Sequence, residues 1–344
     1  MMHSIRHGTS KRTSREMQPA TTSLFEFGLA TAGASTLTLH KNMDSPNATL
    51  RLARARESLE GLSVGDAVGE SLSYQSYRCR ELSDFSAFRP GTLRYTDDTE
   101  MALAIFETLE RLSGIDEDVL AWAYSTRYRT DPDRGYGKMA RHILQEICNG
   151  SPWRDVSKKS FGGGSFGNGA AMRVAPLGAY FSDDLAVVPA MAAKSAHVTH
   201  FHAEGIAGAI AVAVAAAVAC NHRGKPSDVA AKAIWDAVLD FTPESKVRIR
   251  LALSHGFSDV GAMEVAREVG NGSEISAQDT VPFCIWSACK SLATYKEAIL
   301  STVEVGGDCD TNCAIVGGIV SAFSGLDGIP LDWHKAREPL PIKS

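Results

Sequence analysis

A run of sixteen uncharged residues, mostly alanine and valine, extends from Gly205 to Cys220. The run is shorter than the 18 or so apolar residues that would suggest a membrane span. Small apolar residues on every side are typical of a helix that is buried all round. The run therefore predicts a helix at the centre of a helical domain, with other helices packed around it.

From about Ala48 onward, apolar residues recur at intervals of three and four, which places them on one face of an α-helix. One such series runs toward Gly65 and another follows Thr99. Further helices are predicted at 140–148, 185–197, 226–240, 258–270 and 281–301. The sequence contains no alternating strand pattern, no repeat and no linker. We therefore expect one all-α domain over residues 48–340.

The first 47 residues differ in composition from the rest. They are rich in serine and threonine, and the basic residues up to Leu24 outnumber the single acidic residue, Glu16. A disordered tail is the favoured interpretation of residues 1–47. An organelle-targeting peptide or a secretion signal has the same composition and stays open.

Charge and cysteine content narrow the class of protein. The chain has 35 Lys and Arg against 40 Asp and Glu, a net charge of −5, which argues against a nucleic-acid-binding protein. Its 44% hydrophobic residues suffice for a sizeable core. Seven cysteines without a CxxC pair indicate reduced thiols rather than disulfides or a zinc site. We expect a cytoplasmic protein that binds neither nucleic acid nor membrane.

Two acidic clusters each stand directly before an apolar helix. Arg94–Thr99 contains Asp97 and Asp98, and Gly306–Thr311 contains Asp308 and Asp310. Helix N-capping accounts for one acidic residue per helix, but not for two carboxylates with neighbouring threonines. Such oxygen donors favour Mg²⁺, Mn²⁺ or Ca²⁺ over zinc. Four aspartates in one pocket would repel one another unless cations neutralised them.

Glycine-rich segments suggest where an anionic ligand could bind. Gly162–Gly169 cannot form a regular helix, and it could offer backbone N–H groups to a phosphate or serve only as a flexible surface loop. It lacks the ending of a P-loop and the preceding strand of a Rossmann turn. Asp131–Gly137 is a turn whose Tyr136 could stack on a ribose or base. Thr199–His202 places histidines at a helix start, where a structural role is common.

The motifs GDAVG (65–69), YTDDT (95–99), RGYG (134–137), GSFGNGAAMR (164–173), TH (199–200) and GGDCDT (306–311) follow in this order. In this order and spacing they resemble the ADP-ribosylglycohydrolases, a family that includes the ADP-ribosyl-acceptor hydrolases and the dinitrogenase-reductase-activating glycohydrolase. The resemblance covers nearly all of residues 48–333. The RGYG and GSFGNGAAMR motifs look more like the branch that acts on serine-linked ADP-ribose than like the arginine-specific branch.

The resemblance implies a single large helical domain with a binuclear metal cleft that holds two Mg²⁺ ions, or Mn²⁺. It implies a monomer that removes ADP-ribose from a protein or small acceptor by cleaving the C1″ glycosidic bond, and so reverses mono-ADP-ribosylation. The metal ligands it implies are Thr96, Asp97, Asp98, Asp308, Asp310 and Thr311. The substrate-binding residues it implies are Gly135, Tyr136, Gly137, Ser165, Phe166, Gly167, Asn168, Gly169, Met172 and His200.

One position departs from the family pattern. Members commonly carry a glutamate seven residues after the aspartate of the GD motif, and here that position is Ser73. The nearest acid is Glu70, about one helical turn away on the same side if the segment is helical. We expect Asp98, Asp310 and Glu70 to be the catalytic carboxylates. The alternatives are that Glu70 is a solvated surface acid, and that the chain binds ADP-ribose without cleaving it or acts on another linkage.

Overall fold

The apolar run forms helix α9 (Ala203–Asn221) of the computed structural model, which describes residues 46–72 and 90–342. Every residue from Ala207 to Cys220 is buried, as the sequence predicted. Among the described residues, α9 is the one helix long and apolar enough to cross a membrane, and 83% of its most apolar window is buried inside the protein. The core helix of a folded domain meets the same criterion, which makes this weak evidence for a span.

The other described α-helices are α2 (Pro46–Leu72), α3 (Asp97–Leu112), α4 (Glu117–Thr130), α5 (Lys138–Cys148), α6 (Trp153–Lys159), α7 (Ala175–Tyr180), α8 (Val188–His197), α10 (Ser227–Phe241), α11 (Lys246–His255), α12 (Ala262–Val269), α13 (Ala277–Lys290), α14 (Tyr295–Val305), α15 (Cys309–Ser324) and α16 (Leu331–Ala336). Short 3₁₀ turns occur at η2 (Ser160–Gly162), η3 (Asn168–Ala170) and η4 (Leu326–Gly328). The described residues contain two isolated β-bridges and no strand, which confirms the all-α class.

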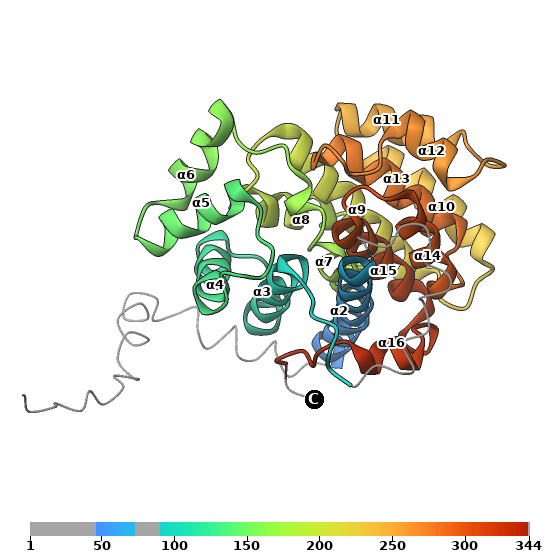
Figure 1. The fold of residues 1–344 in the computed structure, drawn as a ribbon, viewed down its shortest axis with the longest axis horizontal. Helices are drawn as coiled ribbons and strands as arrows, with labels where there is room; N and C mark the ends of the chain where they lie inside the picture. The colour runs from blue at the N-terminus through green and yellow to red at the C-terminus, as the bar shows by residue number, and fades with distance from the viewer. Residues whose placement is uncertain (1–45, 73–89, 343–344) are drawn as a thin grey trace, which may run out of the picture. The chain divides into compact units, whose positions relative to one another are not determined.

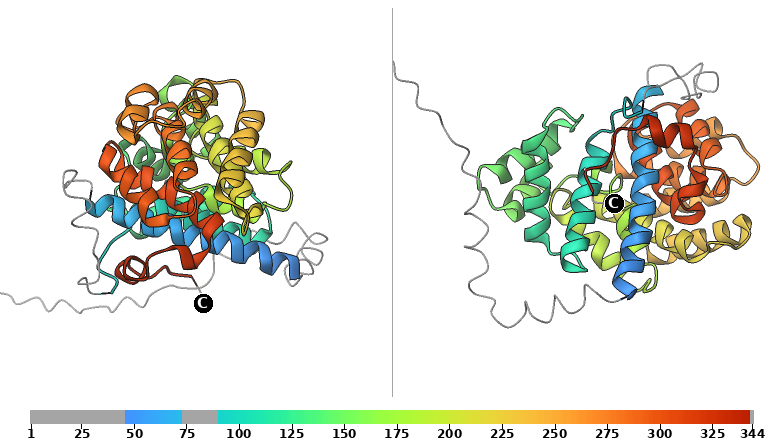
Figure 2. Two further views of the ribbon diagram at one scale, coloured as in Figure 1. Left: turned by 90° about the vertical axis from the view of Figure 1, so that its right-hand side faces the viewer. Right: turned by 90° about the horizontal axis from the view of Figure 1, so that it is seen from below.

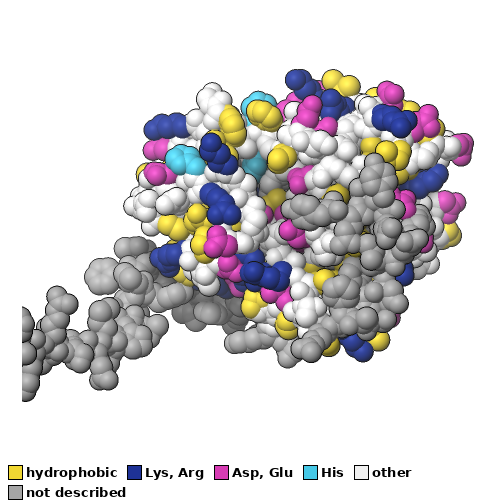
Figure 3. Space-filling model, in the orientation of Figure 1, with side chains coloured by type: hydrophobic (Ala, Val, Ile, Leu, Met, Phe, Trp, Pro, Cys, Tyr) yellow, Lys and Arg dark blue, Asp and Glu magenta, His cyan; other side chains and the backbone are white. Residues whose placement is uncertain are grey.

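The helices surround α9 and a central pair formed by α2 and α15 (Figure 1). Helices α7, α8, α10, α13 and α15 all contact α9. The right-hand view of Figure 2 shows α3 and α4 on one side of α2 and the α10–α14 group on the other. On the face drawn in Figure 3, Lys and Arg side chains are interspersed with Asp and Glu over the described surface.

Two predicted helix boundaries were wrong. The helix predicted at 281–301 is two helices, α13 and α14, separated by a turn in which the Thr294 N–H donates to the Ser291 carbonyl (3.0 Å). Apolar residues continue through this turn at helical intervals, so periodicity alone cannot locate it. The helix predicted at 258–270 begins only at Ala262.

The predicted tail lies almost wholly outside the described residues. Contacts group residues 42–344 into one compact unit, and α2 already begins at Pro46. The disordered or targeting role of residues 1–47 therefore stays a prediction. Ser73 also lies outside the described residues.

Helices α2 and α15 approach so closely that three positions of α2 along the contact have no room for a side chain. A Cβ atom on Gly61 would lie 2.1 Å from Ser321 Oγ, and one on Gly65 would lie 2.1 Å from the Cys313 carbonyl oxygen. A Cβ atom on Gly69 would lie 2.5 Å from the Cys309 carbonyl oxygen. A spacing of four residues aligns these glycines on one face of α2. The helix therefore continues through Gly65 to Leu72 instead of ending there.

Replacement of Gly65 by alanine tests this contact. Alanine favours a helix by about 1 kcal/mol over glycine, but its methyl group would overlap a backbone carbonyl of α15. We expect overpacking to dominate, so that Gly65→Ala lowers the free energy of unfolding by about 1–3 kcal/mol in urea denaturation. Gly114→Ala is the control, because the nearest atom to its Cβ is 3.8 Å away. Equal or greater stability of Gly65→Ala would contradict the close packing.

Candidate active site

The first acidic cluster forms the N-terminal turn of α3, and Asp66 of α2 holds it in place. The buried Asp66 carboxylate accepts hydrogen bonds from Thr96 N (3.0 Å), Thr99 N (3.1 Å) and Thr99 Oγ1 (2.6 Å). Asp66 therefore satisfies backbone N–H groups at the start of the helix. This leaves Asp97 and Asp98 available for another role. Sequence reasoning used Asp66 only to mark a motif and missed this contact.

The second acidic cluster begins α15. Gly306 and Gly307 both have positive φ, and a Cβ atom on Gly307 would lie 2.0 Å from the Asn271 carbonyl oxygen. Only glycine fits there. Asp308 is the N-cap residue, and its carboxylate accepts a hydrogen bond from Asn168 Nδ2 (2.7 Å).

Both acidic turns line one cavity of about 450 Å³. The glycine-rich segment Gly162–Gly169, the glycine loop, lines the same cavity with residues 165–169. The predicted site residues along its wall are Asp97, Asp98, Gly135, Gly137, Ser165, Phe166, Gly167, Asn168, Gly169, Met172, His200, Asp308, Asp310 and Thr311. The structure thus brings together segments that lie more than 200 residues apart in the sequence.

The carboxylates at this cavity oppose one another's ionisation. Burial, followed by the negative charge of Asp310, raises the pKa of Asp97 and of Asp98 well above the usual range. The same two causes raise the pKa of Asp66 and of Asp308 to about 7, although hydrogen bonds from neighbouring residues oppose the rise. A bound cation would remove this repulsion.

The donor set fits a hard cation. Asp98 Oδ1 is buried and has no hydrogen-bond partner among the described residues, so it is an oxygen without a proton donor. The neighbouring oxygen atoms that could bind a metal belong to carboxylates and to the hydroxyls of Thr96 and Thr311. Such oxygen ligands suit Mg²⁺ or Mn²⁺. In the described part of the chain, no three His, Cys, Asp or Glu side chains form a ready-made metal-binding group.

The second half of the glycine loop packs against the rest of the protein. Ser165 and Asn168 are buried, and Asn168 Nδ2 also donates to Thr280 Oγ1 (3.1 Å). The N–H of Gly167 donates to Ser165 Oγ (3.2 Å) and that of Asn168 to the Ile275 carbonyl (3.3 Å). These two N–H groups are used within the protein, so an anion nest would have to use others.

His200 lies buried behind the glycine loop. Its Nδ1 is 2.8 Å from Thr199 Oγ1. Burial, together with the positive charge of Arg173, lowers the pKa of His200 to about 3. A Cβ atom on Gly169 would lie 2.8 Å from Cε1 of the ring, so this glycine lets the loop lie against the imidazole.

A family model described as ADP-ribosylglycohydrolase matches residues 46–341. This chain belongs to the ADP-ribosylglycohydrolase family. It is 30% identical over 333 residues to the human ADP-ribosylhydrolase ARH3, over 83% of this chain and 90% of that protein. It is 25% identical to the ADP-ribosylarginine hydrolase Tri1 of Pseudomonas putida, over 82% of this chain and 73% of that protein. A solved structure titled ADP-ribosylglycohydrolase-related protein complex has a TM-score of 0.57 at 22% identity, over 84% of this chain and 93% of that one. That likeness supports the shared fold.

Three predicted residues of this ADP-ribosylglycohydrolase lie away from the cavity wall. Tyr136 is buried, and its ring packs edge-on against Tyr128 with centroids 5.1 Å apart, so it does not present an aromatic face to a ligand. Thr96 is buried and is the N-cap residue of α3, where its side chain accepts a hydrogen bond from Asp98 N. Glu70 is exposed, and partial burial and the charge of Asp310 raise its pKa.

Other cavity residues of the enzyme were not predicted. The first turns of α5 contribute Lys138, Met139 and Ile143, and exposed Phe161 and Ile275 border the cavity. Helix α5 directly follows the RGYG motif, so its place in the sequence could have indicated that it borders the cavity. Phe161 and Ile275 have positive φ angles of 52° and 51°, which are uncommon for such residues and have no sequence signature.

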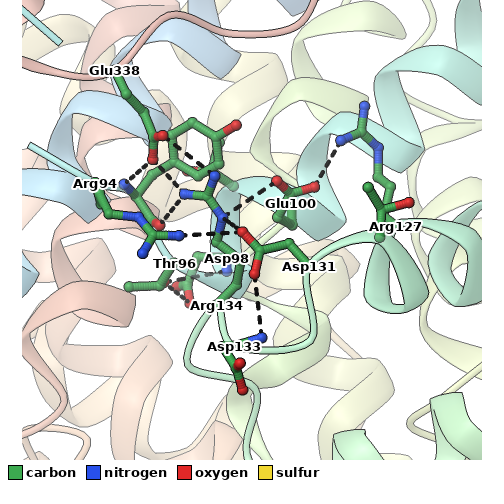
Figure 4. Close-up of polar contacts among 12 residues, drawn as sticks. Arg94, Thr96, Asp98, Glu100, Arg127, Asp131, Asp133, Arg134 and Glu338 are labelled. Atoms are coloured by element: carbon green, nitrogen blue, oxygen red, sulfur yellow. Dashed lines mark hydrogen bonds and ion pairs between the residues drawn. The ribbon is translucent and has the colours of Figure 1, made fainter.

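A charged network anchors the α3 turn to the C-terminal segment (Figure 4). The Glu338 carboxylate accepts hydrogen bonds from Tyr95 N (3.0 Å) and from the Arg134 guanidinium. Arg134 also donates to Asp131 Oδ2 (2.9 Å) and to the Tyr95 carbonyl (3.0 Å). The backbone adds a further tie, because Leu93 N donates to the Ala336 carbonyl (2.8 Å). Residues 336–338 therefore fix the entry to the first acidic turn.

Glu338→Gln tests this anchor. The amide keeps the shape of the side chain but removes the charge that Arg134 pairs with. We expect the free energy of unfolding to fall by about 1–3 kcal/mol in urea denaturation. Glu268→Gln is the charge-matched control at an exposed position, and it should change stability by less than about 0.5 kcal/mol. Equal effects of the two substitutions would show that the network does not stabilise the turn.

Proposed function

We propose that this enzyme is a metal-dependent hydrolase that cleaves the C1″ glycosidic bond between ADP-ribose and a protein or small acceptor. ADP-ribose hydrolysis in general follows from family membership and from the relatives named above. The observation that carries the finer proposal is the single cavity, which joins two acidic turns to a glycine loop and His200.

The cavity suits both halves of such a ligand. Its volume of about 450 Å³ lies within the range of small-molecule sites. The acidic part would face the terminal ribose, whose hydroxyls are neutral oxygen ligands. Gly167 and Gly169 leave the backbone of the loop uncovered by side chains, where a diphosphate could approach.

The residues that would hold two Mg²⁺ or Mn²⁺ ions are Thr96, Asp97, Asp98, Asp308, Asp310 and Thr311. Bound ions would neutralise the crowded carboxylates and orient ribose hydroxyls. The unpartnered Asp98 Oδ1 and the mutual repulsion of the aspartates support this assignment.

Hydrolysis breaks the bond from C1″ to the acceptor and forms a bond from C1″ to a water oxygen. The transition state of such a reaction has oxocarbenium character, which nearby carboxylates stabilise. One carboxylate must take a proton from the water, and the acceptor must leave with a proton. We assign the role of the carboxylate that takes this proton to Asp98 or Asp310. Glu70 is the nearby acid that would replace the family glutamate, whose position is occupied by Ser73 here.

The acceptor linkage is the open part of the proposal. One relative is named an ADP-ribosylarginine hydrolase, whereas the ARH3 relatives carry the general name. The RGYG and GSFGNGAAMR motifs favour serine-linked ADP-ribose. Ser73 supports a second candidate, an ADP-ribose-binding protein that does not cleave.

Incubation with proteins mono-ADP-ribosylated on serine or on arginine tests the proposal. We expect free ADP-ribose to be released from the serine-linked protein in the presence of Mg²⁺, and a chelator to stop this release. Release that persists after the chelator has been verified to remove the metal would contradict metal dependence. Tight binding of ADP-ribose without release from either protein would favour the second candidate.

Substitution of the acidic turns tests the residue assignment. Asp98→Asn and Asp310→Asn should each lower the rate of ADP-ribose release at least about 100-fold, because each removes a carboxylate from the cavity. Asp327→Asn, at an exposed position on η4, is the charge-matched control and should keep the wild-type rate. Unchanged release by either cavity variant would overturn the assignment. Full activity of Glu70→Gln would remove Glu70 from the mechanism.

A further inference from the structure

Arg173 is a fully buried cation next to the cavity. Its guanidinium donates to three neutral acceptors, the Ser195 carbonyl (3.1 Å), Thr199 Oγ1 (2.8 Å) and Met101 Sδ (3.3 Å), and lies 4.4 Å from the centre of the Tyr124 ring. Burying a charge is costly unless it is well solvated by the protein. The cost of burying Arg173 therefore raises the question of which neighbouring side chains this arginine holds in place.

The chain of contacts from Arg173 ends at the cavity. Thr199 Oγ1 lies between the Arg173 guanidinium and His200 Nδ1, at 2.8 Å from each. Thr199 is fully buried and His200 lines the cavity. The negative charges of Asp97 and Asp98 act on Arg173 as well, so the cation also offsets part of the acidic cluster.

The direction of the hydrogen bonds follows from the donors available. Arginine can only donate, so Thr199 Oγ1 accepts from Arg173. The Thr199 hydroxyl then has one proton to place, and the other contact of this oxygen is His200 Nδ1. If His200 Nδ1 carried a proton, the buried Thr199 hydroxyl proton would lose that acceptor, which is unfavourable. The favoured arrangement has an unprotonated Nδ1 that accepts from Thr199.

We propose that Arg173 and Thr199 are positioning residues that hold His200 as a hydrogen-bond donor, with its Nε2–H turned toward the glycine loop of the cavity. The geometry supports this orientation. His200 Nε2 would lie 3.3 Å from a Cβ atom on Gly167 and 3.1 Å from one on Gly169, so this edge of the ring faces the two glycines. Side chains at these glycines would cover the edge of the ring.

In this arrangement His200 donates a hydrogen bond to an oxygen of the bound ligand and does not act as a general base. Nδ1 is occupied by Thr199, and Nε2 already carries its proton. The consequence for ligand binding rests on the proposed function, whereas the protonation pattern of His200 is a property of the protein without ligand.

Long-range ¹H–¹⁵N correlation NMR of ¹⁵N-histidine-labelled protein tests the protonation pattern at pH 7. The His200 signals are assigned by comparison with His200→Gln. We expect a proton on Nε2 and an unprotonated, hydrogen-bonded Nδ1 in the wild type. A proton on Nδ1, or on both nitrogens, would overturn the proposal.

The pair Thr199→Val and Thr199→Ser separates the hydroxyl from the packing. Thr199→Ser retains the hydroxyl, so its Nδ1 signal should match the wild type. Thr199→Val keeps the volume but removes the hydroxyl, so its Nδ1 signal should shift to the value of a nitrogen without this bond. Thermal melting confirms that both variants fold. An Nδ1 signal in folded Thr199→Val identical to the wild type would also overturn the proposal.

Titration calorimetry with ADP-ribose tests the consequence for the ligand. We expect Thr199→Val to bind ADP-ribose about tenfold more weakly than Thr199→Ser. Equal affinity of the two variants would show that the Thr199–His200 hydrogen bond does not contribute to ligand binding. If the wild type has the expected protonation pattern but binds no ADP-ribose, the positioning of His200 by Arg173 and Thr199 is confirmed and the proposed function is wrong.

Discussion

The close contact between α2 and α15 sets the position of the rest of the site. Gly61, Gly65 and Gly69 let the backbone of α2 lie close against α15. Because Asp66 lies on α2 and Asp308 begins α15, this approach brings the holder of the first acidic turn beside the second acidic turn. A wider spacing of the helices would separate the two turns, so the glycines determine the charge density of the cavity.

The cavity concentrates charge of one sign, and the fold compensates for it in two ways. Hydrogen bonds from threonines and Asn168 stabilise Asp66 and Asp308 from the protein side. The buried cation Arg173 offsets the acidic residues from behind the glycine loop. The remaining repulsion is the part that the proposed cations would remove.

The sequence was most informative where a residue type has few structural uses. The apolar run of α9, the paired aspartates at the starts of α3 and α15, and the glycine loop were all predicted, because uncharged runs, closely spaced carboxylates and clustered glycines restrict the local structure. The turn between α13 and α14 was missed, since apolar periodicity continues through it. The capping role of Asp66 and the burial of Tyr136 depend on contacts between distant segments, which no single-sequence pattern encodes.

The pairing of residues 336–338 with the segment before α3 has a consequence for biosynthesis. The Tyr95 N–H at the entry to the first acidic turn and its acceptor Glu338 lie 243 residues apart in the sequence, so the ribosome releases Glu338 long after this turn. A nascent chain can form α2 and α3 early, yet their final geometry must wait for Glu338. The cavity is therefore completed only after Glu338 has been synthesised, and a chain truncated before this residue would fold around an unanchored site.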